Sequence, residues 1–251
     1  LDSIAKLDRL CDDFGLDTIE MGATVAVAME GGLAKFGDAE ASINLADDRP
    51  LMDMMVDAGF DAVFIGIETP EESGLAECNK IQNKNRDLVE DVKRIQRAGL
   101  QVQGGFIVGF DSDTWSVFQR QIDFIQKSGI VTAMVGLLNA IPQTRLYARL
   151  EREGRLLGHS SGNNTDGTTN FVPRMSMDTL LEGYHSILNR IYAPEHYYKR
   201  VRTFLRNYRP PKRPATASWQ NVVAFFRSAW RRGVVGRERF QFWKLLAWTL
   251  V

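Results

Sequence analysis

The chain has 251 residues with 31 Lys/Arg and 31 Asp/Glu, which is enough for one large domain or two small ones and typical of an ordinary soluble protein. Its two cysteines are far apart, which argues against a disulfide framework and favours a reducing, cytoplasmic setting. No signal peptide and no run of 18 apolar residues is present, so nothing in the sequence predicts a membrane span. The chain starts without Met and ends within an apolar pattern, so we expect a fragment.

The zero net charge hides an asymmetry between the two ends of the chain. Residues 199–251 contain 13 Lys/Arg and one acid, Glu238, whereas residues 1–198 contain 18 Lys/Arg and 30 Asp/Glu. An acidic body with a basic tail concerns surfaces and partners rather than fold.

Residues 1–38 predict a helix pair. Apolar residues recur at helical spacing over 3–14, Gly15 ends that helix, and Asp17 and Glu20 fit a capping box that opens the next.

From residue 40 onward, apolar strands alternate with amphipathic helices. Strands are predicted at 41–46, 61–68, 100–110 and 130–140, and helices at 49–59, 85–99, 114–129 and 144–154. Apolar strands that alternate with helices indicate an α/β fold with a parallel sheet covered by helices. The pattern does not separate an open sheet from a barrel, but ligands bind at the C-terminal strand ends of both.

The C-terminal part is predicted to be helical. A polar loop at 158–175 precedes helices that begin near Ser176 and Pro194, and 209–217 is a stiff linker. Two amphipathic helices follow, divided by Gly233 and Gly236.

Each of the last three predicted strands ends in polar or glycine-rich residues. The residues at these ends are Gly66, Glu68 and Thr69, then Gly105, Ile107 and Gly109, then Asn139. A strand-end carboxylate can accept hydrogen bonds from ribose hydroxyls, and glycines let a flat base lie against the backbone. Taken singly, Glu68 could cap a turn and the glycines could serve tight turns. The repetition over three strands favours a nucleoside-like ligand.

These segments resemble the C-terminal half of cobalamin-binding-domain radical S-adenosylmethionine (SAM) proteins over residues 40–251. The resemblance rests on EASINLADD, GFDAVFIGIETPEES, LAECNKIQN, GGFIVGFDSDT, LLNAIPQTRLYARLEREGRL and NNTDGTTNFVP…YAPEHYYKRV. It implies a partial radical SAM β/α barrel, a 4Fe-4S cluster, SAM and cobalamin. It also implies a radical reaction, often methylation, on a small-molecule or lipid-like substrate.

The resemblance also assigns roles to the strand-end residues. It implies that Glu68, with Gly66 and Thr69, contacts polar atoms of SAM, and that Ile107 lies against adenine between Gly105 and Gly109. Asn139 would lie on the adenine side of the same site. Where the family motif often has an acid three residues after its last glycine, this chain has Ser112 between Asp111 and Asp113.

The chain departs from the family at the cluster. The family holds its cluster with C-x-x-x-C-x-x-C, because three thiolates leave one iron open for SAM. Neither that motif nor a cobalamin-binding domain occurs in this sequence, so no metal ligand and no catalytic residue is predicted.

Residues 1–38 resemble a segment of the tungsten-dependent aldehyde:ferredoxin oxidoreductases. The resemblance rests on Asp12, Gly15, Leu16 and Asp17, which match a motif that holds a bis-pterin cofactor. The alternative is a simple helix–Gly–helix corner. Because no second pterin motif follows, tungstopterin is not expected. The abutting resemblances indicate either a fusion or a mis-assembled gene product.

The sequence therefore predicts four segments, at 1–38, 40–157, 158–208 and 209–251. Three functions stay open: a SAM-site fragment of a methyltransferase-like radical SAM enzyme, a non-catalytic ligand-binding or interaction module, and a tungstopterin oxidoreductase fragment. The basic tail either packs on the body or contacts a membrane surface through Trp219, Val223, Phe226 and Trp230. No nucleic-acid partner is predicted, because no stacking or groove-reading motif accompanies the charge.

Overall fold

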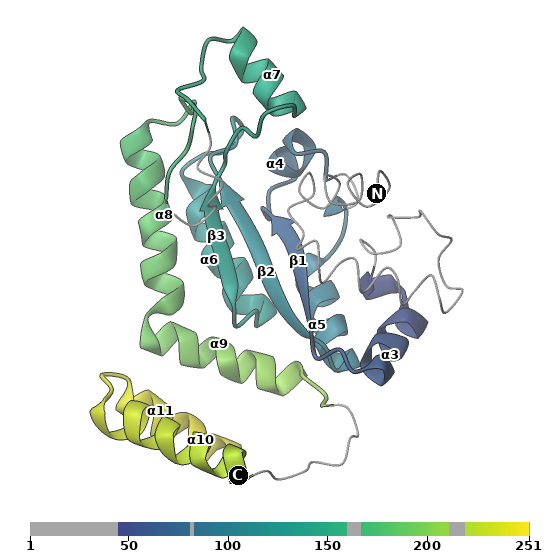
Figure 1. Cartoon of the computed structure of the whole chain (residues 1–251), viewed down its shortest axis with the longest axis vertical. Helices are drawn as coiled ribbons and strands as arrows, with labels where there is room; N and C mark the ends of the chain where they lie inside the picture. The colour runs from purple at the N-terminus through teal and green to yellow at the C-terminus, as the bar shows by residue number, and fades with distance from the viewer. Residues whose placement is uncertain (1–44, 81–82, 160–166, 211–218, 251) are drawn as a thin grey trace.

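The computed structural model describes residues 45–80, 83–159, 167–210 and 219–250. At their centre is a parallel sheet of three strands in the order β1-β2-β3 (Figure 1). The strands are β1 (Ala62–Glu68), β2 (Gln101–Val108) and β3 (Ala133–Leu137). The described residues thus form an α/β fold that is mostly helical, as predicted, while the radical SAM barrel stays a prediction.

Four of the described α-helices begin where a local side chain caps them. The side chains of Asp48, Asp87, Thr144 and Ser176 each accept a hydrogen bond from the backbone N–H three residues on. The α-helices are α3 (Arg49–Ala58), α4 (Glu72–Glu77), α5 (Leu88–Ala98), α6 (Ser116–Ser128), α7 (Arg145–Arg152), α8 (Met177–Tyr192), α9 (Pro194–Asn207), α10 (Trp219–Trp230) and α11 (Arg239–Thr249). A 3-10 helix, η2 (Leu45–Asp47), and a π-helix, η4 (Arg231–Val235), complete the set. All the helices predicted after residue 48 are confirmed, and α4 is an addition.

The strand predicted at 41–46 is wrong where the structure describes it. Leu45–Asp47 is a 3-10 turn, in which the Asp48 N–H donates to the Leu45 carbonyl at 3.1 Å. Leu45 and Ala46 are buried, and η2 packs against α5 rather than pairing with β1. Their apolar character therefore reflects helix packing, which a short apolar run does not distinguish from a strand.

Helices α5 and α6 cover one face of the sheet (Figure 1). On β2 the residues facing them are buried, including Phe106, whose ring meets Phe124 of α6 edge-on at 5.8 Å. Gln103 and Ile107 alternate with them and are half-buried, and Met134 on β3 is exposed. The half-buried face corresponds to the side of a β/α unit that a barrel would turn inward.

The C-terminal helices extend this core and then leave it. Helix α8 packs against α6 and β3, and Leu180, Tyr184, Ile187 and Ile191 belong to the same apolar core as the sheet. Helix α9 packs against α5, α6 and α8, and α11 lies against α9. In Figure 1, α10 and α11 form the end of the molecule opposite α7. The four predicted segment boundaries stay predictions.

Candidate functional site

The carboxyl ends of the three strands meet at one edge because the strands are parallel. This arrangement brings Glu68 and Thr69, Gly109 and Asn139 to the same side of the molecule. Gln121 of α6 ties two of these ends together: its Nε2 donates to the Ile107 carbonyl at 2.7 Å and reaches the Glu68 carbonyl at 3.5 Å. The predicted set is therefore clustered by topology.

Glu68 ends β1 in a constrained conformation. The register between β1 and β2 is regular through Gly66 and Gly105, then shifts so that Glu68 faces Phe106. Glu68 has φ 64°, a left-handed conformation that residues other than glycine seldom adopt. Such a conformation at a strand end marks a position that its surroundings hold in place.

The Glu68 carboxylate is paired with a lysine. Lys80 Nζ lies 3.3 Å from Glu68 Oε1, and both side chains are only 7% exposed. Burial raises the pKa of Glu68, and the adjacent Lys80 opposes that rise. The turn after β1 is capped by Thr69, whose Oγ1 accepts from the Glu71 N–H at 3.2 Å. Glu68 is thus paired with Lys80, and Thr69 rather than Glu68 caps the turn after β1.

The end of β2 is shaped by Gly109 and Asp113. Gly109 has φ 109°, a conformation that favours glycine. Asp113 Oδ2 accepts from the Gly109 and Phe110 N–H groups at 2.8 and 3.0 Å. Burial raises the pKa of Asp113 to about 6, although both backbone bonds lower it. Asp113 therefore fixes the glycine turn.

Asp111 has a different task from Asp113. It accepts from both Arg155 guanidinium nitrogens, at 2.9 and 2.6 Å, and lies near Arg149 and Arg174. The hydrogen bonds from Arg155 lower the pKa of Asp111. Glu77 of α4 accepts from the Ser112 N–H and from Arg149. The loop after β2 is therefore bonded both to α4 and to Arg155. The two acids that flank Ser112 thus organise the rim.

Asn139 lies beyond the end of β3 and is partly committed. Its Nδ2 donates to the Leu137 and Thr168 carbonyls at 3.2 and 3.0 Å. Asn170 forms two hydrogen bonds with the Ala140 backbone: its Oδ1 accepts from the Ala140 N–H at 2.7 Å, and its Nδ2 donates to the Ala140 carbonyl at 2.8 Å. These bonds replace the ladder beyond Leu137, which is why β3 ends earlier than the predicted 140.

Buried acceptors at this edge that lack a partner among the described residues include Asn139 Oδ1, Asp113 Oδ1 and Gln121 Oε1. Buried polar atoms are normally hydrogen-bonded, so unpaired acceptors at a strand-end rim fit a ligand that carries hydroxyl or amino groups. Ile107 is half-buried on the open sheet face and could contact a flat apolar ring. The Phe64 ring already covers Gly105, since a Cβ on Gly105 would lie 2.9 Å from Phe64 Cζ.

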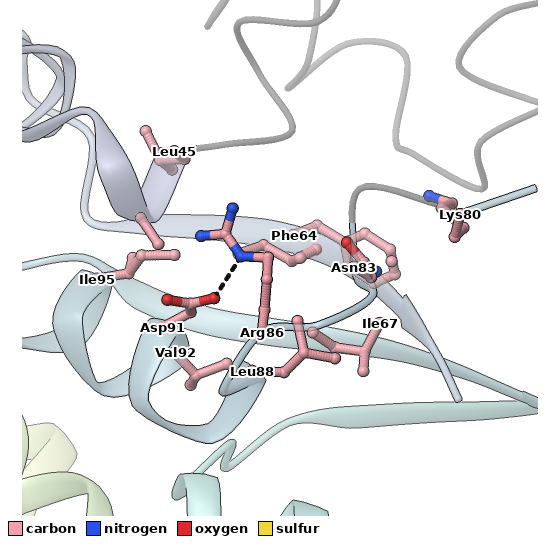
Figure 2. Close-up of a pocket in the computed structure, with 13 residues that line it drawn as sticks. Leu45, Phe64, Ile67, Lys80, Asn83, Arg86, Leu88, Asp91, Val92 and Ile95 are labelled. Carbon is pink, nitrogen blue, oxygen red and sulfur yellow. Dashed lines mark hydrogen bonds and ion pairs between the residues drawn. The ribbon is translucent and has the colours of Figure 1, made fainter. Parts of the chain in front are cut away.

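A small cavity of about 60 Å³ lies beside β1, and its lining includes Gly66 and Lys80 (Figure 2). Phe64 and Ile67 of β1 line it with Leu45, and Arg86 pairs there with Asp91 at 2.8 Å. Pockets for molecules of nucleoside size or larger usually reach about 300 Å³ or more. This cavity is therefore too small to be the nucleoside site.

The donor set does not fit a 4Fe-4S cluster. The sequence has two cysteines, fewer than the three thiolates that such a cluster requires from its protein. Burial raises the pKa of Cys78 to about 11, which favours a neutral thiol over the thiolate that iron binds. Within the described ranges, no group of three His, Cys, Asp or Glu side chains is arranged to hold a metal ion.

Sequence reasoning missed Lys80, Gln121 and Asn170. Lys80 follows a six-residue helix in a polar stretch, so no periodicity distinguishes it. Gln121 is buried on α6, and a buried glutamine within an amphipathic pattern was the available clue. Asn170 lies in the loop predicted as merely polar.

An aromatic cluster around Arg200 lies at the opposite end of the sheet. Arg200 is fully buried and lies 5.7 and 5.4 Å from the Tyr192 and Tyr197 ring centres. Tyr192 donates to the carbonyl of Ala133, the first residue of β3. This cluster packs α9 against the core. The pterin-motif residues Asp12, Gly15, Leu16 and Asp17 lie outside the described residues.

Two protein families match parts of the chain. Residues 144–251 match a domain family of unknown function, DUF4070. Residues 1–55 match aldehyde ferredoxin oxidoreductase, domains 2 and 3, a longer stretch than the 38 residues predicted. That match reaches η2 and α3, which pack with α5 in the described structure.

Curated relatives cover most of the chain. An uncharacterized methyltransferase of Synechocystis is 39% identical over 211 residues, which is 82% of this chain and 39% of the relative. The chain is similar to methyltransferases. A hopanoid C-2 methylase of Rhodopseudomonas palustris is 30% identical over 84% of this chain and 41% of its own length. A bacteriochlorophyllide d C-12(1)-methyltransferase of Chlorobaculum tepidum is 25% identical over 68% of this chain and 38% of its own length.

The chain therefore spans about two fifths of the length of these methyltransferases. In the part of the chain that the structure describes, no helix is both long and apolar enough to cross a bilayer.

Proposed function

We propose that this chain is the SAM-binding part of a radical SAM methyltransferase of the cobalamin-dependent class. The observation that carries the proposal is the 39% identity to a methyltransferase across 82% of the chain. The clustering of Glu68, Gly109 and Asn139 at one sheet edge supports it. The names of two relatives, a hopanoid methylase and a bacteriochlorophyllide methyltransferase, support a large and mainly apolar substrate.

Each strand-end residue has a task in this proposal. Asn139 Oδ1 accepts from the adenine amino group or a ribose hydroxyl, since it is buried and free of other partners in the described residues. Ile107 contacts the adenine face, and the Gly109 turn, fixed by Asp113, keeps backbone close to the ligand. Glu68 contacts SAM when Lys80 shares or releases its carboxylate, which is why the ion pair belongs to the site.

Bound SAM with a reduced cluster would supply the carbon radical that such enzymes use. This sequence does not supply the three thiolates for that cluster, so these residues bind and orient SAM but do not generate the radical. The proposal assigns the cluster and the cobalamin to protein outside this sequence.

A chimera tests the proposal. The matching segment of the Synechocystis methyltransferase is replaced by residues 45–251 of this chain, and SAM-dependent formation of 5′-deoxyadenosine is measured anaerobically after iron–sulfide reconstitution. We expect the chimera to cleave SAM, and the Asn139→Ala version to require more SAM for half-maximal rate. An Asn189→Ala chimera is the matched control, because Asn189 is exposed on α8.

Loss of SAM cleavage in a chimera that still binds its cluster would contradict the proposal. It would favour the second candidate, a non-catalytic ligand-binding or interaction module, which the cysteine count supports. The tungstopterin fragment rests on the match over residues 1–55. Measurement of tungsten in the purified chain decides that candidate, and a stoichiometric content would support it.

A further inference from the structure

Helix α10 carries an apolar stripe that the rest of the described chain leaves uncovered. Trp219, Val222, Phe226 and Trp230 are separated by three, four and four residues, which places them on one helical face. Their exposed fractions are 77%, 38%, 65% and 66%. Isolated exposed apolar residues are ordinary, but a continuous stripe with two tryptophans marks an interaction surface.

Other large apolar side chains of the tail are also exposed. Val234 and Val235 in η4 are exposed, as are Phe240 and Trp243 in α11. The segment that carries these side chains, residues 219–250, is named the tail hairpin below. Both helices of the tail hairpin therefore expose large apolar side chains.

Positive charge lies beside the stripe. The tail hairpin contains six Lys/Arg and one acid, Glu238, which lies 3.7 Å from Arg232. Arg227 and Arg231 follow Phe226 and Trp230 directly in sequence and are exposed. Arginine beside aromatic side chains lets the rings enter an apolar layer while the guanidinium groups stay with phosphate groups.

The tail hairpin is anchored to the body, so its surface has a defined direction. Trp243 Nε1 donates to the Gly233 carbonyl at 2.8 Å and joins α11 to η4. Arg202 and Arg206 of α9 lie 5.8 and 5.6 Å from the Trp248 ring centre. The hairpin therefore forms one end of the molecule, beyond α9 and opposite α7 (Figure 1).

We propose that the tail hairpin binds the surface of an anionic lipid membrane, with the α10 stripe inserted among the lipid headgroups. A basic helix with an aromatic apolar face is the pattern of interfacial binding. A second copy of the chain fits less well, because a shared interface would bring like charges together. A nucleic acid would use the arginines but leave the apolar stripe exposed to water.

Vesicle sedimentation of the full chain tests the proposal. Vesicles of phosphatidylcholine alone are compared with vesicles that also contain phosphatidylglycerol, at low and high NaCl. We expect binding to the anionic vesicles, weakening as salt rises, and a blue shift of tryptophan fluorescence on binding. The double variant Phe226→Ser/Trp230→Ser should lower the partition coefficient at least about tenfold, since each side chain loses its transfer into the lipid. Arg227→Gln/Arg231→Gln should weaken binding to anionic vesicles and remove much of its salt dependence.

Leu157→Ser is the matched control, because Leu157 is 62% exposed and lies outside the tail hairpin. Since Phe226 and Trp230 are exposed, the serine variant should keep the wild-type circular dichroism and melting temperature. Equal vesicle binding by wild type and the serine variant would overturn the proposal. So would a wild-type dimer that the serine variant dissociates in sedimentation velocity, or retention on duplex DNA without vesicle binding.

Discussion

Lys80 Nζ lies 3.3 Å from Glu68 Oε1, with both side chains 7% exposed. A buried ion pair is costly to break, because removal of one partner leaves the other charge without water or counter-ion. Lys80→Met should therefore lower the free energy of unfolding by about 3–5 kcal/mol at neutral pH. The double variant Glu68→Gln/Lys80→Met should recover much of that loss, which denaturant titration measures.

Protonation offers a second readout of the same pair. Lys80 is what opposes the rise in the pKa of Glu68, so Lys80→Met raises this pKa further. A raised carboxyl pKa means that the folded state gains stability as pH falls, and the loss in Lys80→Met should shrink toward pH 5. Lys199→Met, at an exposed lysine, is the control. An equal loss at both pH values would contradict a buried, unpaired Glu68.

Helices α6 and α8 meet at Gly183 and Phe118. A Cβ on Gly183 would lie 2.2 Å from two atoms of the Phe118 ring. Gly183→Ala should lower the free energy of unfolding by about 1–3 kcal/mol, even though alanine favours helix more than glycine does. Phe118→Leu in the same chain should restore part of the loss. Ser186→Ala, on the exposed side of α8, should show no loss in the same thermal melts.

The Asp111–Arg155 pair should contribute to stability mainly above acid pH. Arg155 holds the pKa of Asp111 below its ordinary 3.8, so this contribution is present above that value and is lost as pH falls through the lower, folded-state pKa. Asp111→Asn should cost about 1–3 kcal/mol at neutral pH, because several charge-assisted bonds weaken. Asp53→Asn, in an exposed pair with Arg49, should cost under about 1 kcal/mol. Equal losses in the two variants would indicate that the Asp111–Arg155 pair is exposed to solvent.

Asp113 should titrate near pH 6. Its pKa is raised to about 6 from an ordinary 3.8, so the folded state binds the proton more tightly than the unfolded state. Stability from this group therefore decreases as pH rises from about 4 to about 6, and Asp113→Asn should remove that slope. Carbon-13 NMR of the carboxyl group measures the midpoint directly. A midpoint near 4 would mean that the carboxylate is hydrated.

The caps and apolar runs were sufficient to predict most of the elements. The predicted cap at Ser176 is a bond that spans three residues, so a local sequence pattern specifies it. The caps at Asp48 and Asp87 are equally local but were not predicted. The strands at 61–68 and 100–110 were predicted from near-continuous apolar residues. The strand at 41–46 failed at Leu45 and Ala46, because a short apolar run fits a buried turn equally well.

For the strand-end residues, the sequence predicted their grouping but not their partners. Glu68, Gly109 and Asn139 were predicted to lie together, since parallel strands bring their carboxyl ends to one edge. Their partners were not predicted. Lys80, 12 residues after Glu68, reaches it only because α4 turns the chain back, and no periodicity encodes that path.

By itself, the sequence determined the alternation of strands and helices, the helix starts and the basic tail, because short-range bonds and composition decide them. Only the tertiary structure decided that Lys80 pairs with Glu68, that Asp113 rather than Asp111 fixes the Gly109 turn, and that Asn139 Oδ1 has no partner among the described residues. Those outcomes depend on which buried groups find a partner across long sequence separations. In a low-dielectric interior, burial makes that choice energetically decisive.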